Sequence, residues 1–332
     1  MSSEFNLIDK YFIGRQAQRK DVLLAAGDDC ALVKSPDKVS IAITTDTLVC
    51  GTHFVANADP AWVAHKALAA NISDLAAMGA TPSWASLALT LPEIDQAWLE
   101  SFSDAFFQLS DYFDIQLIGG DTTKGPLSIT LTVQGTIPEG KALTRSQAQV
   151  GDWIYVTGQL GDSKAGLDVI LDHTKRSKPF AEVLEQRHYR STPRVLAGQA
   201  LLGIANSAID ISDGLVADLG HILERSQVGA SLDVGLLPIS QELVQFVGDP
   251  IVALQYALTS GEEYELCFTV PEANKGTIES ALAHCGVKVT CIGQIRPAGV
   301  FELHYQGQSV DWDIEGFDHF KTTSPTNSES TN

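Results

Sequence analysis

The pattern of apolar and polar residues predicts strands throughout the first half of the chain. Residues 39–45 (VSIAITT) are rich in β-branched side chains and alternate in polarity, and the polar pair Asp46 and Thr47 follows them. This period of two is typical of a half-buried strand, so we expect a strand that presents polar residues at its tip. Further strands are expected at residues 85–91, 127–136 and 115–118, the last ending at the loop GGDTT, residues 119–123.

Helices are expected between these strands. The alanine-rich segment 61–78 follows Asp59, which suits a helix N-cap, and Pro60, which suits a first turn. Gly79 then ends the apolar periodicity. Two more helices are expected, at residues 4–12 and 95–113. Strands alternating with helices in this way favour an α/β arrangement.

The second half mixes helices and strands less regularly. Helices are expected near residues 162–171, after Pro193 and from Asp213, and strands at residues 153–157, 208–211, 265–270, 289–295 and 301–305. Residues 138–152 contain Pro, Gly and mixed charge, which is typical of a connection between domains. We therefore predict a two-domain chain of class α/β plus α+β: an N-terminal α/β domain at residues 1–140, a C-terminal α+β domain at 150–320 and a disordered polar tail at 321–332.

Composition and charge narrow the possible functions. The 332 residues are 44% hydrophobic, enough for sizeable cores, and have a formal net charge of −19. A surface this acidic repels phosphate backbones, so nucleic acid is not an expected partner. The first residues contain neither a basic leader nor an apolar segment, and no run of about 18 apolar residues occurs, so we expect a cytoplasmic protein without a membrane partner. The five cysteines contain no CxxC pair and are expected to be reduced and mostly buried.

Aspartates recur beside Gly, Ser or Thr where elements are expected to end. The segments are GDDC (27–30), TTDT (44–47), GGDTT (119–123) and DISDG (210–214), and NISD (71–74) places Asn71 and Asp74 on one helical face. Any one of them is more often a turn or a helix cap than a ligand. Two carboxylates about 4 Å apart repel by about 4 kcal/mol, so several in one cleft would require cations. Their recurrence indicates Mg²⁺ ions that bridge a polyphosphate, which favours nucleotide chemistry.

Longer strings resemble the bacterial thiamine-monophosphate kinase family. They occur in the family's order and spacing over nearly the whole chain: GDDCALV, AITTDTLVCGTHF, ALAANISDLAAMGATP, LIGGDTTKGPLSITLTVQG, ALTRS, GDWIYVTGQLGDS, AIDISDGL, SGEEYELCFTV and GFDHF. The shorter motifs GGDT and SDG mark the wider superfamily that includes aminoimidazole ribonucleotide synthetase and selenophosphate synthetase. The resemblance implies ATP-dependent transfer of a phosphoryl group to thiamine monophosphate, giving thiamine diphosphate. It also implies a homodimer built through the N-terminal domains.

The same resemblance implies the residues of the site. Several Mg²⁺ ions would lie between phosphates and the metal residues Asp29, Thr44, Thr45, Asp46, Asp74, Asp121, Asp210 and Asp213. The residues implied for ATP are Gly120, Asp121, Arg145 and Ser212, and those implied for thiamine monophosphate are His53, Glu262 and Phe317. Of these, Asp46, Asp74, Asp121 and Arg145 are the expected catalytic residues, and the need for a monovalent cation is left open.

Two positions depart from the family pattern. Many members have Ser where this chain has Thr44, a change that keeps a hydroxyl group. The family commonly has Asp where this chain has Glu263, beside the expected substrate residue Glu262, and the effect on the pocket is left open.

Other functions stay open at this point. Aminoimidazole ribonucleotide synthetase is the nearest sibling, whereas selenophosphate synthetase and the hydrogenase maturation factors would need a reactive cysteine that the corresponding segments lack. From other classes, the chain is compatible with a non-catalytic Mg-nucleotide sensor or a two-metal phosphohydrolase. Formation of thiamine diphosphate from ATP and thiamine monophosphate discriminates among them.

Overall fold

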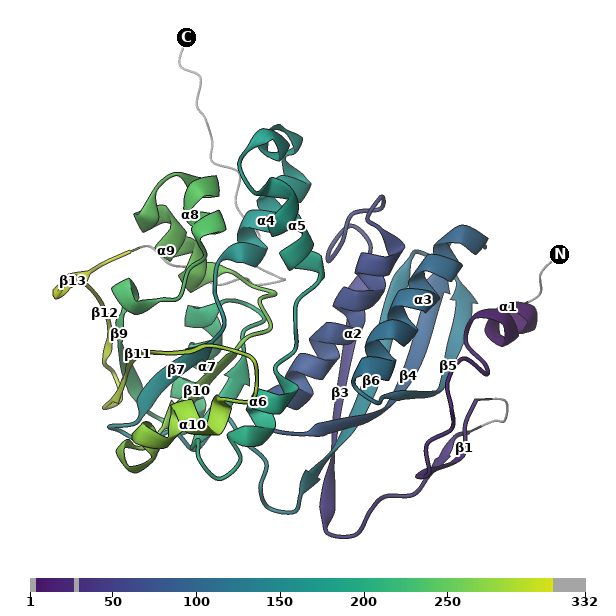
Figure 1. Ribbon diagram of the computed structural model, residues 1–332, viewed down its shortest axis with the longest axis horizontal. Helices are drawn as coiled ribbons and strands as arrows, with labels where there is room; N and C mark the ends of the chain where they lie inside the picture. The colour runs from purple at the N-terminus through teal and green to yellow at the C-terminus, as the bar shows by residue number, and fades with distance from the viewer. Residues whose placement is uncertain (1–3, 27–29, 313–332) are drawn as a thin grey trace.

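The computed structural model describes residues 4–26 and 30–312, which form two domains, each built on its own sheet (Figure 1). The N-terminal sheet has four strands in the order β3 (Val39–Val49), β6 (Ser128–Pro138), β4 (Thr81–Leu91) and β5 (Gln116–Lys124). β6 is antiparallel to both of its neighbours, and β4 and β5 are parallel. A short antiparallel hairpin, β1 (Val22–Leu24) and β2 (Leu32–Val33), and the helix α1 (Glu4–Tyr11) lie beside this sheet.

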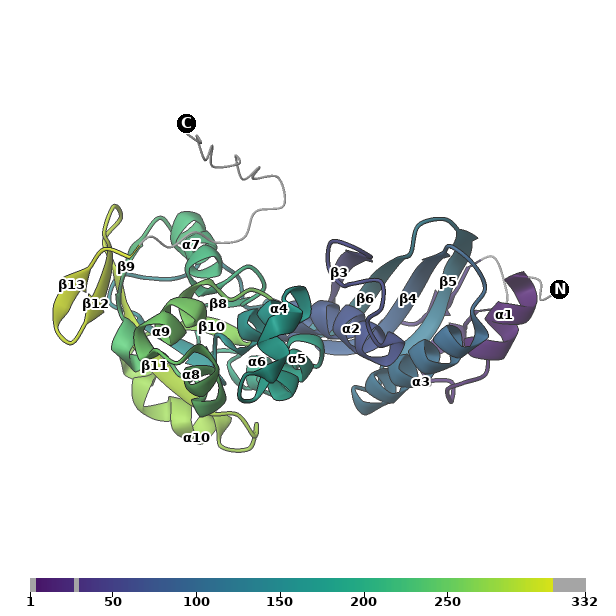
Figure 2. The same cartoon turned by 90° about the horizontal axis from the view of Figure 1, so that it is seen from above.

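Two helices cover one face of the N-terminal sheet (Figure 2), whereas on the other face the β1–β2 hairpin covers only part of the sheet, where Val22 packs with Trp84 and Ile118, and the rest is open. They are α2 (Pro60–Ala77) and α3 (Gln96–Tyr112). Asp59 caps α2 by accepting the N–H of Ala61, and Pro60 occupies its first position, as the sequence predicts. The alanines of α2 are buried because the small side chains let the helix pack between the sheet and the second domain.

The C-terminal sheet has seven strands in a mixed arrangement. Their order is β13 (Gln308–Val310), β12 (Phe301–Tyr305), β9 (Gly229–Asp233), β11 (Val289–Arg296), β7 (Trp153–Thr157), β10 (Leu266–Val270) and β8 (Ser207–Asp210). The α-helices of this domain are α4 (Asp162–Leu171), α5 (Ala181–Tyr189), α6 (Val195–Ala200), α7 (Leu215–Ser226), α8 (Gln241–Val247), α9 (Pro250–Thr259) and α10 (Ile278–Leu282). Short 3₁₀ turns lie at η1 (His173–Ser177), η2 (Val234–Leu236) and η3 (Glu272–Thr277).

The two domains are packed against each other along α2. This helix contacts α5, α6 and β8 of the second domain, and one continuous apolar cluster includes Leu68 of α2 and Phe268 of β10. The approach of α6 to α2 is very close: a Cβ atom on Gly198 would lie 1.8 Å from the carbonyl oxygen of Ala76. The segments on either side of the junction are therefore held in a fixed relation, which matters for the site described below.

Two expectations about strand ends are corrected by the structure. Thr44, Thr45 and Asp46 lie within β3, which continues to Val49, and do not form its tip. The GGDTT segment likewise lies within β5 and is not a loop after it. Hydrogen bonds between the hydroxyls of Thr45 and Thr132, and of Thr47 and Thr130, explain how β3 continues through polar residues.

The five cysteines differ in their exposure to solvent. All five cysteines are free, but Cys267 alone among them is buried and Cys30 is exposed, so the expectation of mostly buried thiols is wrong.

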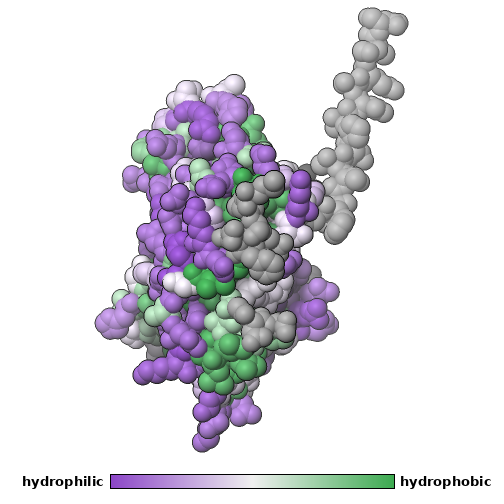
Figure 3. All heavy atoms as spheres, turned by 90° about the vertical axis from the view of Figure 1, so that its right-hand side faces the viewer, coloured by the Kyte–Doolittle hydropathy of each residue, from purple (hydrophilic) through white to green (hydrophobic). Residues whose placement is uncertain are grey.

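Within the described part of the chain, no helix is both long and apolar enough to cross a membrane. The side of the molecule seen in Figure 3 is mostly hydrophilic, with apolar patches toward its lower end. The predicted disordered tail, residues 321–332, lies outside the described residues.

Candidate active site

The structure brings carboxylates from three elements together at the junction of the domains. Asp46 comes from β3, Asp74 from the last turn of α2 and Asp210 from the end of β8. The hydroxyl of Thr44 donates a hydrogen bond to Oδ2 of Asp74, and the hydroxyl of Ser73 donates one of 2.7 Å to Oδ2 of Asp210. We call Asp46, Asp74 and Asp210 the acidic cluster.

The electrostatics of the acidic cluster show that its charges oppose one another. Burial raises the pKa of Asp46 to about 6, and the charge of Asp74 adds to this effect. Burial also raises the pKa of Asp210 to about 8, again with a contribution from Asp74, while the hydrogen bond from Ser73 opposes the shift. The pKa of Asp74 is raised by burial, and the Thr44 hydrogen bond and Arg145 oppose the rise. Three carboxylates in this environment favour a bound cation or a bound proton.

Arg145 supplies positive charge next to the acidic cluster. It lies on the connection between the domains, and its guanidinium acts to lower the pKa of both Asp74 and Asp210. Its carbonyl oxygen accepts a hydrogen bond of 2.8 Å from the hydroxyl of Ser226 in α7, which ties the connection to the second domain. The side chain is exposed, so it is accessible to an anionic ligand.

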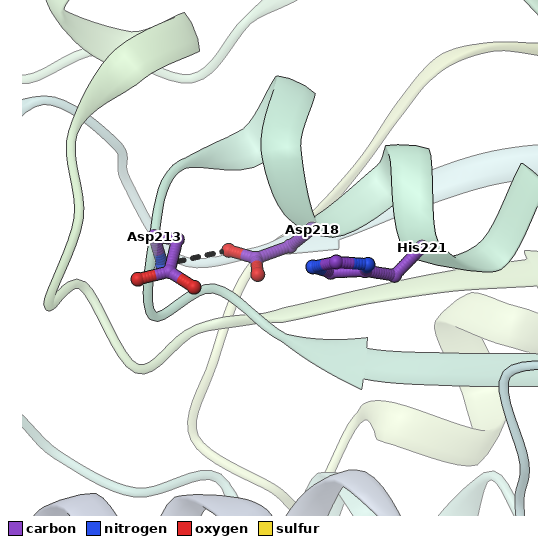
Figure 4. Close-up of side chains that lie close together, drawn as sticks. All are labelled: Asp213, Asp218 and His221. Atoms are coloured by element: carbon purple, nitrogen blue, oxygen red, sulfur yellow. Dashed lines mark hydrogen bonds between the residues drawn. The ribbon is translucent and has the colours of Figure 1, made fainter. Parts of the chain in front are cut away.

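A second group of possible metal ligands lies at the start of α7 (Figure 4). One ligand atom each from Asp213, Asp218 and His221 can be chosen so that all three lie within 4.8 Å of one another. Oδ2 of Asp218 accepts the backbone N–H groups of Ser212, Asp213 and Gly214, each at 3.0 Å. Burial raises the pKa of Asp218 to about 7 even though these hydrogen bonds oppose the rise. Asp218 therefore fixes the turn on which Ser212 and Asp213 lie.

The expected substrate residues His53 and Glu262 are joined by one buried lysine. Nζ of Lys66 lies 2.8 Å from Oε1 of Glu262 and 2.8 Å from the carbonyl oxygen of His53. Nδ1 of His53 accepts the backbone N–H of Val49 at 3.0 Å. The structure thus places these two residues, which are far apart in the sequence, at the same point of the domain junction.

Thr45 and Asp121 are not brought to the acidic cluster. Asp46 lies in one row across the sheet with Leu131, Leu87 and Gly120, and the leucines are buried on the helical face. Asp121 pairs instead with the exposed Ala88, so its side chain lies on the open face, as that of Thr45 does. Two strands also separate β3 from β5, which corresponds to about 14 Å. Within one chain, these two predicted ligands are separated from Asp46 and Asp74 by the sheet.

The remaining predicted residues have different outcomes. Gly120 lies where a Cβ atom would meet the carbonyl oxygen of Leu87 at 1.9 Å, so the residue is required by strand packing. Glu263 accepts hydrogen bonds from the backbone N–H groups of Gly161 and Ser163, at 2.7 and 3.1 Å, and so caps the start of α4. Burial raises its pKa to about 8. Asp29 and Phe317 lie outside the described residues.

Several residues near the site were not predicted from the sequence. Tyr264 is buried, and burial together with the charges of Glu262, Asp46, Asp210 and Asp74 raises the pKa of its hydroxyl. Lys66, His188, Asp218 and His221 were also missed. A lysine within the alanine-rich run AWVAHKALAA was the one available signal, because a charged residue among so many small apolar ones is unusual.

The donor set of the acidic cluster fits Mg²⁺. Carboxylate and hydroxyl oxygens from Thr44, Asp46, Asp74 and Asp210 are hard ligands, and no sulfur ligand is present among them. Burial, with a smaller contribution from the charge of Asp74, raises the pKa values of Asp46 and Asp210, so a positive charge beside them would stabilise their ionised forms. These residues are therefore suited to hold divalent cations against phosphate oxygens.

Comparisons with known proteins agree with this architecture. Residues 27–137 match the N-terminal domain of AIR synthase related proteins, and residues 149–306 match the C-terminal domain of the same proteins. The chain is 55% identical over 322 residues to the thiamine-monophosphate kinase of Escherichia coli K12, covering 96% of this chain and 98% of that protein. It is 48% identical to the enzyme of the same name from Haemophilus influenzae, with the same coverage.

Solved structures give the same result. The crystal structure of thiamine-monophosphate kinase from Stenotrophomonas maltophilia K279a superposes with a TM-score of 0.81 at 42% identity, covering 88% of this chain and 93% of that one. AaThiL complexed with AMPPCP and TMP superposes with a TM-score of 0.75 at 32% identity, covering 88% and 91%. The similarity therefore extends over both domains and includes a structure determined with a nucleotide analogue.

Proposed function

Because this chain belongs to the thiamine-monophosphate kinase family of enzymes, we propose that it transfers the γ-phosphoryl group of ATP to thiamine monophosphate by direct in-line displacement assisted by several Mg²⁺ ions. The products are thiamine diphosphate and ADP. The relative complexed with AMPPCP and TMP supports these two substrates. The observation that bears most of the proposal is the convergence of Asp46, Asp74 and Asp210 beside Arg145 at the junction of the domains.

The chain's own residues supply positioning and charge. Asp46, Asp74 and Asp210, together with Thr44, would hold the Mg²⁺ ions, and Asp29 and Asp213 are proposed as further ligands. When bound, Mg²⁺ supplies the positive charge that lets two phosphate groups approach each other. Arg145 contributes further positive charge toward the phosphates, and Gly120 and Ser212 are proposed to contact ATP.

The acceptor phosphate needs no general base from the protein. The second pKa of a phosphomonoester is about 6, so thiamine monophosphate is largely a dianion at neutral pH and its oxygen is already a nucleophile. Phosphoryl transfer then depends on alignment of the two phosphates and on neutralisation of their charge. This is the chemistry for which a site rich in carboxylates and an arginine, without a dedicated base, is suited.

The thiamine end of the substrate is assigned to the other part of the site. Glu262 and His53 lie together there, linked by Lys66. An aromatic residue, Phe317, is proposed to stack on the cationic thiazolium ring. Phe317→Ala is expected to raise KM for thiamine monophosphate more than KM for ATP, and equal effects would count against this role.

We propose a homodimer formed through the open face of the N-terminal sheet. This face exposes Ile41 and Ile43, at 42% and 64%, as well as Thr45 and Asp121. A second copy on this face would cover the isoleucines, as a stable interface requires. It would also give Thr45 and Asp121 a role, because they would serve the site of the other copy. Partners beyond the substrates and the second copy, such as nucleic acid or a membrane, are not proposed, and a cytoplasmic location fits the substrates.

One assay separates this function from the alternatives. The purified protein is incubated with ATP, Mg²⁺ and thiamine monophosphate, and the products are resolved by chromatography. Thiamine diphosphate together with ADP is the expected result. Release of inorganic phosphate alone would indicate a hydrolase, and Mg-ATP binding without turnover would indicate a sensor.

A further inference from the structure

Lys66 is a buried ammonium group at the junction of the two domains. It lies in the middle of α2 with 1% of its surface exposed, and no other lysine among the described residues is buried. Its Nζ atom contacts the carbonyl oxygen of His53 at 2.8 Å, Nε2 of His188 at 3.0 Å and both carboxylate oxygens of Glu262, at 2.8 and 2.9 Å. The segments that contain His53, His188 and Glu262 therefore all contact the ammonium group of Lys66.

The donors and acceptors of this group match one another. A charged lysine has three N–H donors, and here three acceptor groups surround it: a carbonyl, an imidazole nitrogen and a carboxylate. His188 must accept at Nε2, so its proton lies on Nδ1, which faces the hydroxyl and the carbonyl oxygen of Ser163 at 3.0 and 3.2 Å. Burial and the nearby Lys66 lower the pKa of His188 to about 4, in agreement with a neutral ring.

Glu262 is fixed by this arrangement on one side and open on the other. Its backbone has a φ of 58°, in the left-handed region, and its N–H donates to the carbonyl oxygen of Ser212 at 2.7 Å. Its side chain remains 26% exposed although Lys66 binds both oxygens. A fully enclosed ion pair would add little to stability, because desolvation offsets the attraction. A carboxylate that a lysine binds on one side, and that is partly exposed to solvent on the other, is instead suited to bind a ligand that carries N–H groups or positive charge.

We propose that Lys66 is a positioning residue for the thiamine end of the substrate, holding the carboxylate of Glu262 and the turn at His53 in the arrangement that the substrate recognises. His188 supports Lys66 by filling its third donor position and linking it to Ser163 in α4. This inference rests on the proposed function, since it names thiamine monophosphate as the ligand. Lys66 itself does not contact the reacting phosphates in this account, so nucleotide affinity is expected to be independent of it.

The test compares KM values for the two substrates in three variants. Lys66→Met keeps an unbranched side chain one atom shorter than lysine and removes its charge. Glu262→Gln keeps the shape of the carboxylate. The double variant removes both charges and so avoids an unpaired buried carboxylate. Lys66→Met is expected to raise KM for thiamine monophosphate at least about tenfold and to change KM for ATP less than about twofold. In the Glu262→Gln background the same substitution is expected to add less than about threefold, because Lys66 acts through Glu262.

Lys175→Met is the matched control. Lys175 also forms an ion pair of 2.8 Å, with Asp168, but it is 30% exposed and contacts none of the residues assigned to the substrate. Both KM values of this variant are expected to equal those of the wild type. An unchanged KM for thiamine monophosphate in Lys66→Met, equal increases for both substrates, or full additivity in the double variant would overturn the inference. A wild-type protein that forms no thiamine diphosphate would instead overturn the proposed function, and the ligand named here with it.

Discussion

At the scale of single residues, the acidic cluster that we propose to hold Mg²⁺ lowers the stability of the metal-free fold. Burial and mutual repulsion raise the pKa values of Asp46 and Asp210 to about 6 and about 8, well above those of free aspartate. A group whose folded pKa is raised contributes stability below its unfolded pKa and loses that contribution as the pH rises through its folded pKa. Without metal, the cluster therefore weakens the fold progressively between about pH 4 and pH 8.

Replacement of Asp46 by Asn tests this cost directly. The shift of its pKa from 3.8 to about 6 corresponds to about 3 kcal/mol. In the metal-free protein, we expect Asp46→Asn to be up to about 3 kcal/mol more stable than the wild type at pH 8 and nearly equal to it at pH 4. Urea unfolding in the presence of EDTA at both pH values measures the difference. A stability difference that does not change with pH would contradict the conclusion that the ionised Asp46 carboxylate destabilises the metal-free protein.

The sequence allowed the chemistry of several residues to be predicted but not their surroundings. The aspartates beside Thr and Gly were recognisable because their oxygens suit Mg²⁺, and the structure gathers Asp46, Asp74 and Asp210. Lys66 was missed because its partners His53, His188 and Glu262 lie 13, 122 and 196 positions away. No local pattern reveals contacts of that kind, and those with His188 and Glu262 arise only when the two domains pack.

At the scale of elements, α2 is the part that organises the site. Its N-terminal cap at Asp59 and its end near Gly79 were predictable from cap chemistry, and the structure confirms them to within one or two residues. Its last turn holds Asp74 and its middle holds Lys66, so a shift of this helix would move both parts of the site. The expected ends of β3 and β5 were wrong, because threonine ladders and parallel pairing extend these strands through their polar residues.

The contact between α6 and α2 gives a test at this scale. A Cβ on Gly198 would lie 1.8 Å from the carbonyl oxygen of Ala76, two residues beyond Asp74. Gly198→Ala is expected to destabilise the protein by about 1–3 kcal/mol and to lower kcat, because the backbones must separate. Gly220→Ala in α7 is the control, since a Cβ there meets nothing within 4 Å. The measurements are the denaturant midpoint and kcat of each variant. Equal midpoints, or an increased midpoint for Gly198→Ala, would show that the close approach of α6 to α2 at Gly198 is not required.

At the scale of the whole molecule, the fold class was accessible from the sequence, whereas the homodimer implied by the resemblance stays a prediction. Alternation of helices and strands predicted two mixed domains, and the two matched domain models agree with that prediction. The position of Asp121 on the open face, across the sheet from Asp46, was not predictable, because it depends on the register of β5 with β4. Because Asp121 lies on the face proposed for the dimer interface, we propose that it serves the site of the second copy.

Mixing two inactive variants tests the shared site. If Asp121 serves the site of the other copy, then Asp46→Asn and Asp121→Asn proteins, each inactive alone, should form mixed dimers with one intact site. After co-refolding or co-expression, about a quarter of wild-type activity per chain is expected from random pairing. Activity that stays at the level of the separate variants would show that both residues act within one chain or that the chain works as a monomer.

The acidic residues that give the net charge of −19 fall into two groups. Most acidic residues in the described part of the chain are exposed or half-buried, and the side of the molecule shown in Figure 3 is mostly hydrophilic. A few converge at the domain junction, where bound Mg²⁺ would reverse the local charge and allow an acidic protein to bind two polyanions. Phosphoryl transfer should therefore depend steeply on Mg²⁺.

The most direct measurement is a Mg²⁺ titration of product formation by the wild type and Asp46→Asn. ADP and thiamine diphosphate are quantified together at saturating ATP and thiamine monophosphate. We expect equimolar products from the wild type with a steep dependence on Mg²⁺, and a loss of kcat of at least about a hundredfold in Asp46→Asn with a flatter dependence. Unequal products, or an Asp46→Asn protein whose kcat and Mg²⁺ dependence match those of the wild type, would contradict the account.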